Sequence, residues 1–278
     1  MLDETNLPSI EAELQIIREL PYHENLVNCK KAHIESRNNL YIIMEYCNQG
    51  SVEGLIEKMT LMAEEKIWEF LRQVCRGYQV LHDNNLLHRD IKPENILVHN
   101  GVYKLADFGL AKRVVNPMAL QKLSFKGTPI YIAPEVAEQV EGSAKVDVFS
   151  LGCVLYQLAY AGEHPFYKPD SNYQSPFAYY KEMRGATLML KQKNKRGEVR
   201  SMELRRLLEQ MLQRDQSKRI SWEGLFEHQR IDINKVREKQ PRTENEAGKE
   251  LMTLTRSLVE INRSSATMRQ FAEKPNVR

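Results

Sequence analysis

Polar side chains able to do chemistry are concentrated in two short stretches of the chain. The stretches are His88-Arg89-Asp90-Ile91-Lys92-Pro93-Glu94-Asn95 and, twelve residues after Asn95, Asp107-Phe108-Gly109. Carboxylate and amide oxygens, as on Asp107 and Asn95, are the ligands that Mg²⁺ prefers over nitrogen or sulfur. A carboxylate such as Asp90 can also accept or orient a proton. A lone Asp or Asn is more simply read as part of a surface turn, so the interpretation depends on their occurring together.

Two further motifs follow in order, Gly127-Thr128-Pro129 and Ala133-Pro134-Glu135. Together the four pieces resemble the signature set of the protein-kinase family in identity, order and spacing. About ten specified positions at near-fixed intervals make this a very specific signal. The chain therefore resembles the catalytic domain of a eukaryotic-type serine/threonine protein kinase, and the resemblance covers roughly Glu11 to Ile231.

The resemblance implies transfer of the γ-phosphate of Mg-ATP to serine or threonine hydroxyls of a protein substrate, with ATP and Mg²⁺ as cofactors. Asp90 would accept or orient the proton of the acceptor hydroxyl. Lys92 would place a cation near the transferred phosphoryl group, and Thr128 would bridge Asp90 and Lys92. Asn95 and Asp107 would hold Mg²⁺.

The resemblance also implies an ordered column of core residues. Phe108 would stack on His88, then on Ile17 and Cys29, with Asp147 anchoring the base of the column. Gly109 gives the backbone after Asp107 dihedrals that are closed to other residues, which suits a segment that must swing.

Two more pairs are expected to support the site. Glu135 and Arg219 resemble a buried ion pair of the family. Arg89, beside the catalytic Asp90, would be an unpaired cation until an anion arrives, and an upstream kinase that phosphorylates Ser124 would supply one. Ser124 is otherwise an ordinary loop serine.

The surrounding sequence predicts the elements that position these residues. Apolar residues at helical spacing predict a helix from Pro8 to Leu20, and two strands are expected at Leu26 to Ile34 and Leu40 to Tyr46. From Gly50 to about residue 231 the pattern is mostly helical. A long helix carries Ile67, Phe70, Leu71, Val74, Tyr78 and Leu81 on one face, and Val146 to Leu158 reads as a buried helix.

We therefore expect an α+β, protein-kinase-like bilobal fold, with a mostly helical C-lobe and a truncated N-lobe of one helix plus two strands. Residues 1–47 would form the N-lobe and hinge, 48–231 the C-lobe, and 232–278 a charged tail. From Gln229 on, 11 Lys and Arg face 7 Asp and Glu. The tail is expected to be a helix docked on its own domain or a mostly disordered segment.

The predicted N-lobe departs from the family pattern. Glu13 shares a helix face with Ile10 and Ile17, so its carboxylate either meets a cation or lies solvated at the rim. By resemblance, Glu13 matches the glutamate that pairs with a strand lysine contacting ATP. However, no lysine precedes Lys30 and no glycine-rich loop precedes Glu13. Three explanations stay open: a fragment of an active kinase, a genuine short form lacking activity, and a pseudokinase scaffold.

The hinge is expected to contact the adenine of ATP. By resemblance, Met44 would guard the back of the adenine pocket, and Glu45, Tyr46 and Cys47 would form the hinge. Within the family, three stretches are similar to the unc-51-like kinases that initiate autophagy. They are His23-Glu24-Asn25-Leu26-Val27, Ile43-Met44-Glu45-Tyr46-Cys47 and His99-Asn100-Gly101-Val102-Tyr103-Lys104.

Two rival functions come from other classes. One is a binding protein that uses the large lobe and basic tail, and the other is a small-molecule phosphotransferase. Thr128 with Ala133-Pro134-Glu135 argues against the second, because that loop resembles one built for an extended peptide.

The composition of the chain excludes several classes of protein. The 278 residues are 42% apolar and 28% charged with a net charge of +3, which is typical of a soluble globular protein and gives no reason to expect nucleic-acid binding. No membrane-spanning run is visible, and the acidic start Met1-Leu2-Asp3-Glu4 is unlike a secretory leader. We therefore expect a cytoplasmic protein whose four cysteines are reduced and mostly buried.

Overall fold

The computed structural model describes residues 14–35, 39–58, 62–166 and 197–233, together with residues 180, 183, 188, 190, 191 and 193. The chain divides into two compact units. Of the described residues, the first unit contains 14–22 and 28–45, and the second contains 23–27 and those from 46 onward. The predicted tail and Glu13 lie outside the described residues.

The first unit contains a helix and a hairpin. Residues 14–19 are helical. Strand β1 (Cys29–Glu35) pairs antiparallel with β2 (Asn39–Met44), in a register that places Glu35 opposite Asn39 and Lys31 opposite Ile43. The two predicted strands are therefore present, each shifted by one to three residues at its ends.

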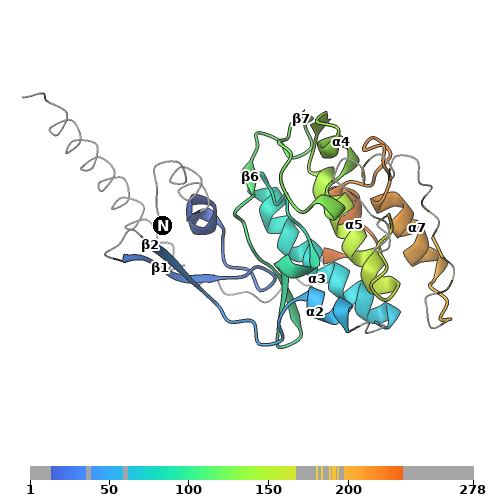
Figure 1. Cartoon of the computed structure of the whole chain (residues 1–278), viewed down its shortest axis with the longest axis horizontal. Coiled ribbons are helices and arrows are strands. Elements are labelled where there is room, and N and C mark those ends of the chain that lie inside the picture. The colour runs from blue at the N-terminus through green and yellow to red at the C-terminus, as the bar shows by residue number, and fades with distance from the viewer. Residues whose placement is uncertain are drawn as a thin grey trace, which may run out of the picture. The chain divides into compact units, whose positions relative to one another are not determined.

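The second unit is built around two long helices, α3 (Glu64–Asp83) and α5 (Lys145–Ala159), which pack against each other (Figure 1). All six residues of the predicted α3 face are buried, and every residue of α5 after Lys145 is buried. Both helices were predicted, and the structure confirms them. Tyr78 of α3 stacks on Trp222 at 3.5 Å between ring centroids.

The described residues of the second unit also form shorter helices. They are α2 (Val52–Glu57), α4 (Pro134–Ala137), α7 (Met202–Met211) and α8 (Trp222–Phe226), with single 3₁₀ turns η1 (Pro93–Asn95) and η2 (Pro129–Tyr131). Ser201 and Ser221 cap α7 and α8, since each side chain accepts a hydrogen bond from the backbone three residues on. Helix α7 packs on α5, so α5 is enclosed from several directions.

Three two-stranded ladders in this unit were not predicted. They are β3 (Leu86–Leu87) with β6 (Lys112–Arg113), β4 (Ile96–His99) with β5 (Val102–Leu105), and β7 (Gln121–Lys122) with β8 (Glu141–Gly142). Their strands are two to four residues long, too short to show a period in the sequence. The mostly helical pattern beyond Gly50 therefore gave no sign of these short strands.

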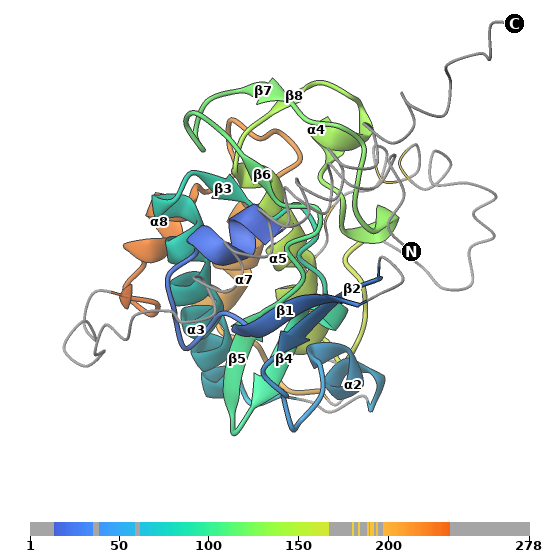
Figure 2. The ribbon, with the colours of Figure 1, turned by 90° about the vertical axis from the view of Figure 1, so that its left-hand side faces the viewer.

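The β4–β5 hairpin had a signal that the sequence analysis overlooked. Asn100 and Gly101 have φ values of 50° and 80°, the two positive values that a type I′ turn requires. The tip is held by the residues after the predicted hinge. Asn48 exchanges two hydrogen bonds with Asn100, and the Gly101 amide donates to Gln49 at 2.6 Å (Figure 2 shows the hairpin).

The segment before β1 crosses α3 at a glycine. A Cβ at Gly77 would lie 2.5 Å from the backbone oxygen of Asn25. That oxygen accepts a hydrogen bond from the Leu105 amide at 2.9 Å, and the Asn25 side chain donates to the Tyr103 carbonyl at 2.9 Å. The absence of a side chain at position 77 therefore lets one segment join α3 to β5.

All four cysteines are free and buried, in agreement with the sequence prediction. Burial raises the pKa of the Cys75 and Cys153 thiols, which keeps them protonated at neutral pH. Among the residues that the structure describes, none of the helices combines the length and the apolar character needed to span a membrane.

The Gly77 crossing can be tested by adding one methyl group. Gly77→Ala should lower the free energy of unfolding by about 1–3 kcal/mol, because the Asn25 backbone must shift to make room. Gly54→Ala in α2 is the control, since a Cβ there meets nothing within 4 Å, and it should be neutral or add up to about 1 kcal/mol. Urea unfolding measures both. Equal effects of the two substitutions would contradict the close approach.

Candidate active site

The conformation of the loop at residues 88–90 depends on the carboxylate of Asp147 at the start of α5. This carboxylate accepts hydrogen bonds from the His88 amide at 2.7 Å, the Arg89 amide at 2.8 Å and the Tyr78 hydroxyl at 2.7 Å. Burial raises the pKa of Asp147, while its neighbour His88 and these donors act in the opposite direction. The three bonds hold Arg89 at a φ of 68°, a strained value for a residue with a side chain.

His88 connects this loop to the end of β5. Its ring is fully buried, with Nδ1 3.3 Å from the Asp90 amide and Nε2 3.1 Å from the Ala106 carbonyl. An amide donates and a carbonyl accepts, so these bonds assign the ring proton to Nε2. The Phe108 ring lies 5.5 Å from the His88 ring. Ile17 and Cys29 belong to the first unit, and their place in the column stays a prediction.

Asp90, Lys92 and Thr128 are joined by hydrogen bonds. Lys92 Nζ lies 2.9 Å from Asp90 Oδ2 and 2.9 Å from Thr128 Oγ1. The Thr128 amide and hydroxyl both donate to Asp90 Oδ1, at 3.2 and 3.3 Å. Asp90 is buried, so neighbouring polar groups fix its carboxylate in one orientation.

Asn95 and Asp107 are brought together by the β4–β5 hairpin. Asn95 precedes β4 and Asp107 follows β5 by two residues, and the Ala106 amide donates to the Asn95 carbonyl at 2.9 Å. The Asn95 amide nitrogen donates to both the backbone and the side-chain oxygen of Asp90, at 3.0 and 2.9 Å. This leaves the Asn95 side-chain oxygen as its potential metal ligand.

Asp107 has an exposed side chain and a φ of 63°, and its Oδ1 accepts from the Gly109 amide at 3.2 Å. Within the described part of the chain, no cluster of three or more His, Cys, Asp or Glu could hold a metal by itself. One carboxylate and one amide oxygen nevertheless suit Mg²⁺, which takes much of its coordination from phosphates and water. Asn95 and Asp107 therefore fit the predicted ion.

Gly127 is a contributor that the sequence analysis named only as part of a motif. Its φ is 113°, and a Cβ there would lie 2.9 Å from the Arg89 carbonyl oxygen. No other residue would let the Thr128 segment come this close to the loop at residues 88–90, the predicted catalytic loop. The need arises from tertiary contact, so no local sequence signal reveals it.

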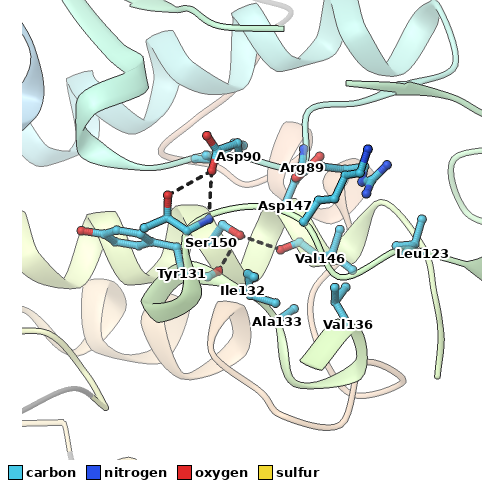
Figure 3. A pocket seen from close by; sticks show the side chains of 13 residues that line it. Arg89, Asp90, Leu123, Tyr131, Ile132, Ala133, Val136, Val146, Asp147 and Ser150 are labelled. Atoms are coloured by element: carbon cyan, nitrogen blue, oxygen red, sulfur yellow. Dashed lines mark hydrogen bonds between the residues drawn. The ribbon is translucent and has the colours of Figure 1, made fainter. Parts of the chain in front are cut away.

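Two residues of α5 hold the following turn and were also missed. Ser150 Oγ donates to the Tyr131 carbonyl at 2.8 Å, and the Tyr131 hydroxyl donates to Gln157 at 3.0 Å. Figure 3 shows Asp90 on one side of a small cavity, with Tyr131 and Ser150 on the other. The α5 helix therefore supports both the catalytic loop, through Asp147, and the segment facing it.

The Arg89 guanidinium contacts Ser124. It donates to Ser124 Oγ at 2.7 Å and to the Ser124 carbonyl at 3.1 Å. Burial lowers the pKa of Arg89, an effect that Asp147 partly opposes, so the charge lies in a partly desolvated place. Ser124 follows strand β7, and the buried Leu123 lies between them.

Glu135 and Arg219 form a buried, two-pronged ion pair. Their nitrogen–oxygen distances are 2.6 and 2.9 Å, and the Arg219 side chain is fully buried. The other guanidinium protons go to backbone carbonyls of Gln213, Arg214 and Lys145. This pair ties α4 to the segment before α8.

The predicted hinge residues fall on both sides of the unit boundary. In the first unit, Glu45 accepts from the Asn28 amide at 2.7 Å and Met44 is 51% exposed. In the second unit, Cys47 packs with Val27 and Ala106. Contact of these side chains with a nucleotide stays a prediction, as does the role of Glu13.

The buried ion pair generates a stability prediction. Glu135→Gln leaves the Arg219 charge buried and unneutralised, so it should lower the free energy of unfolding by about 3–5 kcal/mol. The same change at Glu69, which pairs with Lys66 on the surface of α3, should cost less than about 1 kcal/mol. Chemical denaturation of both variants measures the difference. A Glu135→Gln loss as small as that of Glu69→Gln would count against the pair.

The chain is similar to several known proteins. Residues 2–231 match the model of the protein kinase domain. Serine/threonine-protein kinase ULK3 of Homo sapiens is 31% identical over 84% of this chain and 47% of its own length. Serine/threonine-protein kinase unc-51 of Caenorhabditis elegans is 33% identical over 78% of this chain and 25% of its own. Nek3 of Mus musculus is 42% identical over 52% of this chain and 28% of its own.

The chain thus spans less than half the length of these curated relatives. The similarity to unc-51-like kinases that the sequence suggested is confirmed. With its family model covering most of the sequence, the chain belongs to the protein kinase family and is similar to serine/threonine kinases of the unc-51-like group.

Proposed function

We propose that this protein transfers the γ-phosphate of Mg-ATP to serine or threonine hydroxyls of protein substrates. The observation that carries the proposal is the hydrogen-bonded group of Asp90, Lys92, Thr128 and Asn95 at the base of the β4–β5 hairpin. Family membership supports the reaction class, and the contacts within this group support the role proposed for each residue.

Asp90 is the group that orients the acceptor hydroxyl and accepts its proton. Thr128 holds Oδ1 of its carboxylate, while Lys92 and Asn95 hold Oδ2. Donors on both oxygens fix the orientation of the carboxylate before the reaction, which is where enzymes gain much of their rate. One of these donors gives up its place when the acceptor hydroxyl bonds to Asp90. Lys92 Nζ adds a positive charge beside the attacking oxygen.

Asn95 and Asp107 would hold Mg²⁺, which neutralises charge on the phosphates when it is bound. Glu13, Met44, Glu45 and Cys47 are proposed as part of the ATP site on their resemblance to the family motifs alone. We place the protein in the cytoplasm, acting on protein substrates, and its near-balanced net charge of +3 gives no reason to expect nucleic-acid binding.

The catalytic role of Asp90 can be tested with an isosteric change. Asp90→Asn should lower kcat for phosphate transfer to a serine/threonine peptide library by about 10²–10⁴-fold, because the amide cannot accept the proton. Asp83→Asn is the control, since Asp83 is exposed at the end of α3. Radiolabelled ATP measures the transfer.

A thermal shift with Mg-ATP separates the proposal from its alternative. The parent and both variants should be stabilised by bound nucleotide. If the parent chain gains no stability and transfers no phosphate, the alternative of an impaired short form or a pseudokinase scaffold is favoured instead.

We also propose that phosphorylation of Ser124 by an upstream kinase raises activity. Arg89 already donates to the Ser124 hydroxyl, so a phosphate would convert a neutral acceptor into a dianion and strengthen the contact. Protein with phosphoserine incorporated at position 124 should show a higher kcat/KM than unmodified protein, and Arg89→Gln should remove the gain. Phosphoserine at Ser217, an exposed residue beside Asp215, is the control. A Ser124→Ala variant as active as the Ser124-phosphorylated protein would refute the proposal.

A further inference from the structure

Tyr180 contacts the chain on both sides of Gly127-Thr128. Its hydroxyl donates to the Pro129 carbonyl at 2.6 Å. Its ring meets the Phe125 ring edge-on, at 5.9 Å between centroids and an interplanar angle of 88°. Tyr180 is 6% exposed, and burial raises the pKa of its phenol, so the hydroxyl stays protonated and able to donate. One side chain therefore touches both flanks of the segment that carries Thr128.

The segment 125–129 needs contacts from other parts of the chain to hold its conformation. Phe125 is 43% exposed, Lys126 is exposed, and Gly127 adopts a φ of 113° that only glycine adopts readily. Glycine also leaves the backbone free to take many other conformations. Thr128 must nevertheless stay within hydrogen-bond distance of Asp90 and Lys92.

Other elements hold the residues on either side of Pro129. The catalytic loop holds Thr128, and α5 holds Tyr131 through Ser150 and Gln157. Pro129 lies between these two anchors, and its carbonyl receives the Tyr180 hydroxyl as well as the amide of Ile132. Tyr180 thereby joins the two anchored points to Phe125 on the far side of the glycine.

We propose that Tyr180 is a positioning residue, which holds the segment 125–129 so that Thr128 stays against Asp90. It does not touch the reacting atoms and acts through Pro129 and Phe125. The effect on catalysis rests on the proposed kinase function, whereas the effect on the segment does not.

The test removes the hydroxyl and keeps the ring. Tyr180→Phe should open the segment about fivefold more often, the change expected when one hydrogen bond is lost. Tyr160→Phe is the matched control, because the Tyr160 hydroxyl donates to the Lys191 carbonyl at 2.8 Å and Tyr160 is also buried. Trypsin cleavage of the native protein at the Lys126–Gly127 bond, followed by mass spectrometry, reports how often the segment is open without requiring activity.

A second readout connects the segment to catalysis. In Tyr180→Phe the kcat for a peptide substrate should fall, by at most about fivefold, because Thr128 then holds the Asp90 carboxylate for a smaller fraction of the time. The KM for ATP should stay at the parent value, and Tyr160→Phe should change neither. Unchanged cleavage in Tyr180→Phe, or equal cleavage in the two variants, would overturn the proposal. Faster cleavage with an unchanged kcat in an active enzyme would overturn its link to catalysis. If the parent transfers no phosphate, the proposed function fails, and the cleavage rates alone decide the role of Tyr180.

Discussion

The carboxylate of Asp147 is the group on which the rest of the site depends. It lies fully buried at the start of α5, where an uncompensated charge would be very costly. Two backbone amides of the catalytic loop and one hydroxyl of α3 compensate it. The same bonds hold Arg89 in its strained conformation. They therefore offset both the burial of the Asp147 charge and the backbone strain at Arg89. Because Asp90 directly follows Arg89, these bonds also fix the position of Asp90.

The segment that faces the catalytic loop is also held in place by several contacts. The segment from Ser124 to Tyr131 is bound by the catalytic loop, by α5 and by Tyr180, and the Glu135–Arg219 pair fixes α4 immediately after it. These contacts join parts of the chain that are far apart in sequence, since Glu135 and Arg219 are 84 residues apart. The site is therefore a product of the whole second unit.

Much of this could be predicted from the sequence, and the reasons for success and failure are physical. The α3 and α5 helices carry long apolar patterns, which are the most reliable signals in a sequence. Asp90, Lys92, Asn95 and Asp107 were identifiable because their types and spacing are tied to one another. The short ladders carry no readable period, although Asn100-Gly101 marked one hairpin. Gly127 and Tyr180 act through tertiary contacts, which no local pattern encodes.

The β4–β5 hairpin has a mechanical consequence. At its open end it presents Asn95 and Asp107, and at its closed end Asn48 and Gln49 clasp its tip. The ladder between the two ends has four residue pairs, which span about 13 Å at the usual rise per residue. One short ladder therefore connects the residues that leave the predicted hinge to the oxygens suited to Mg²⁺.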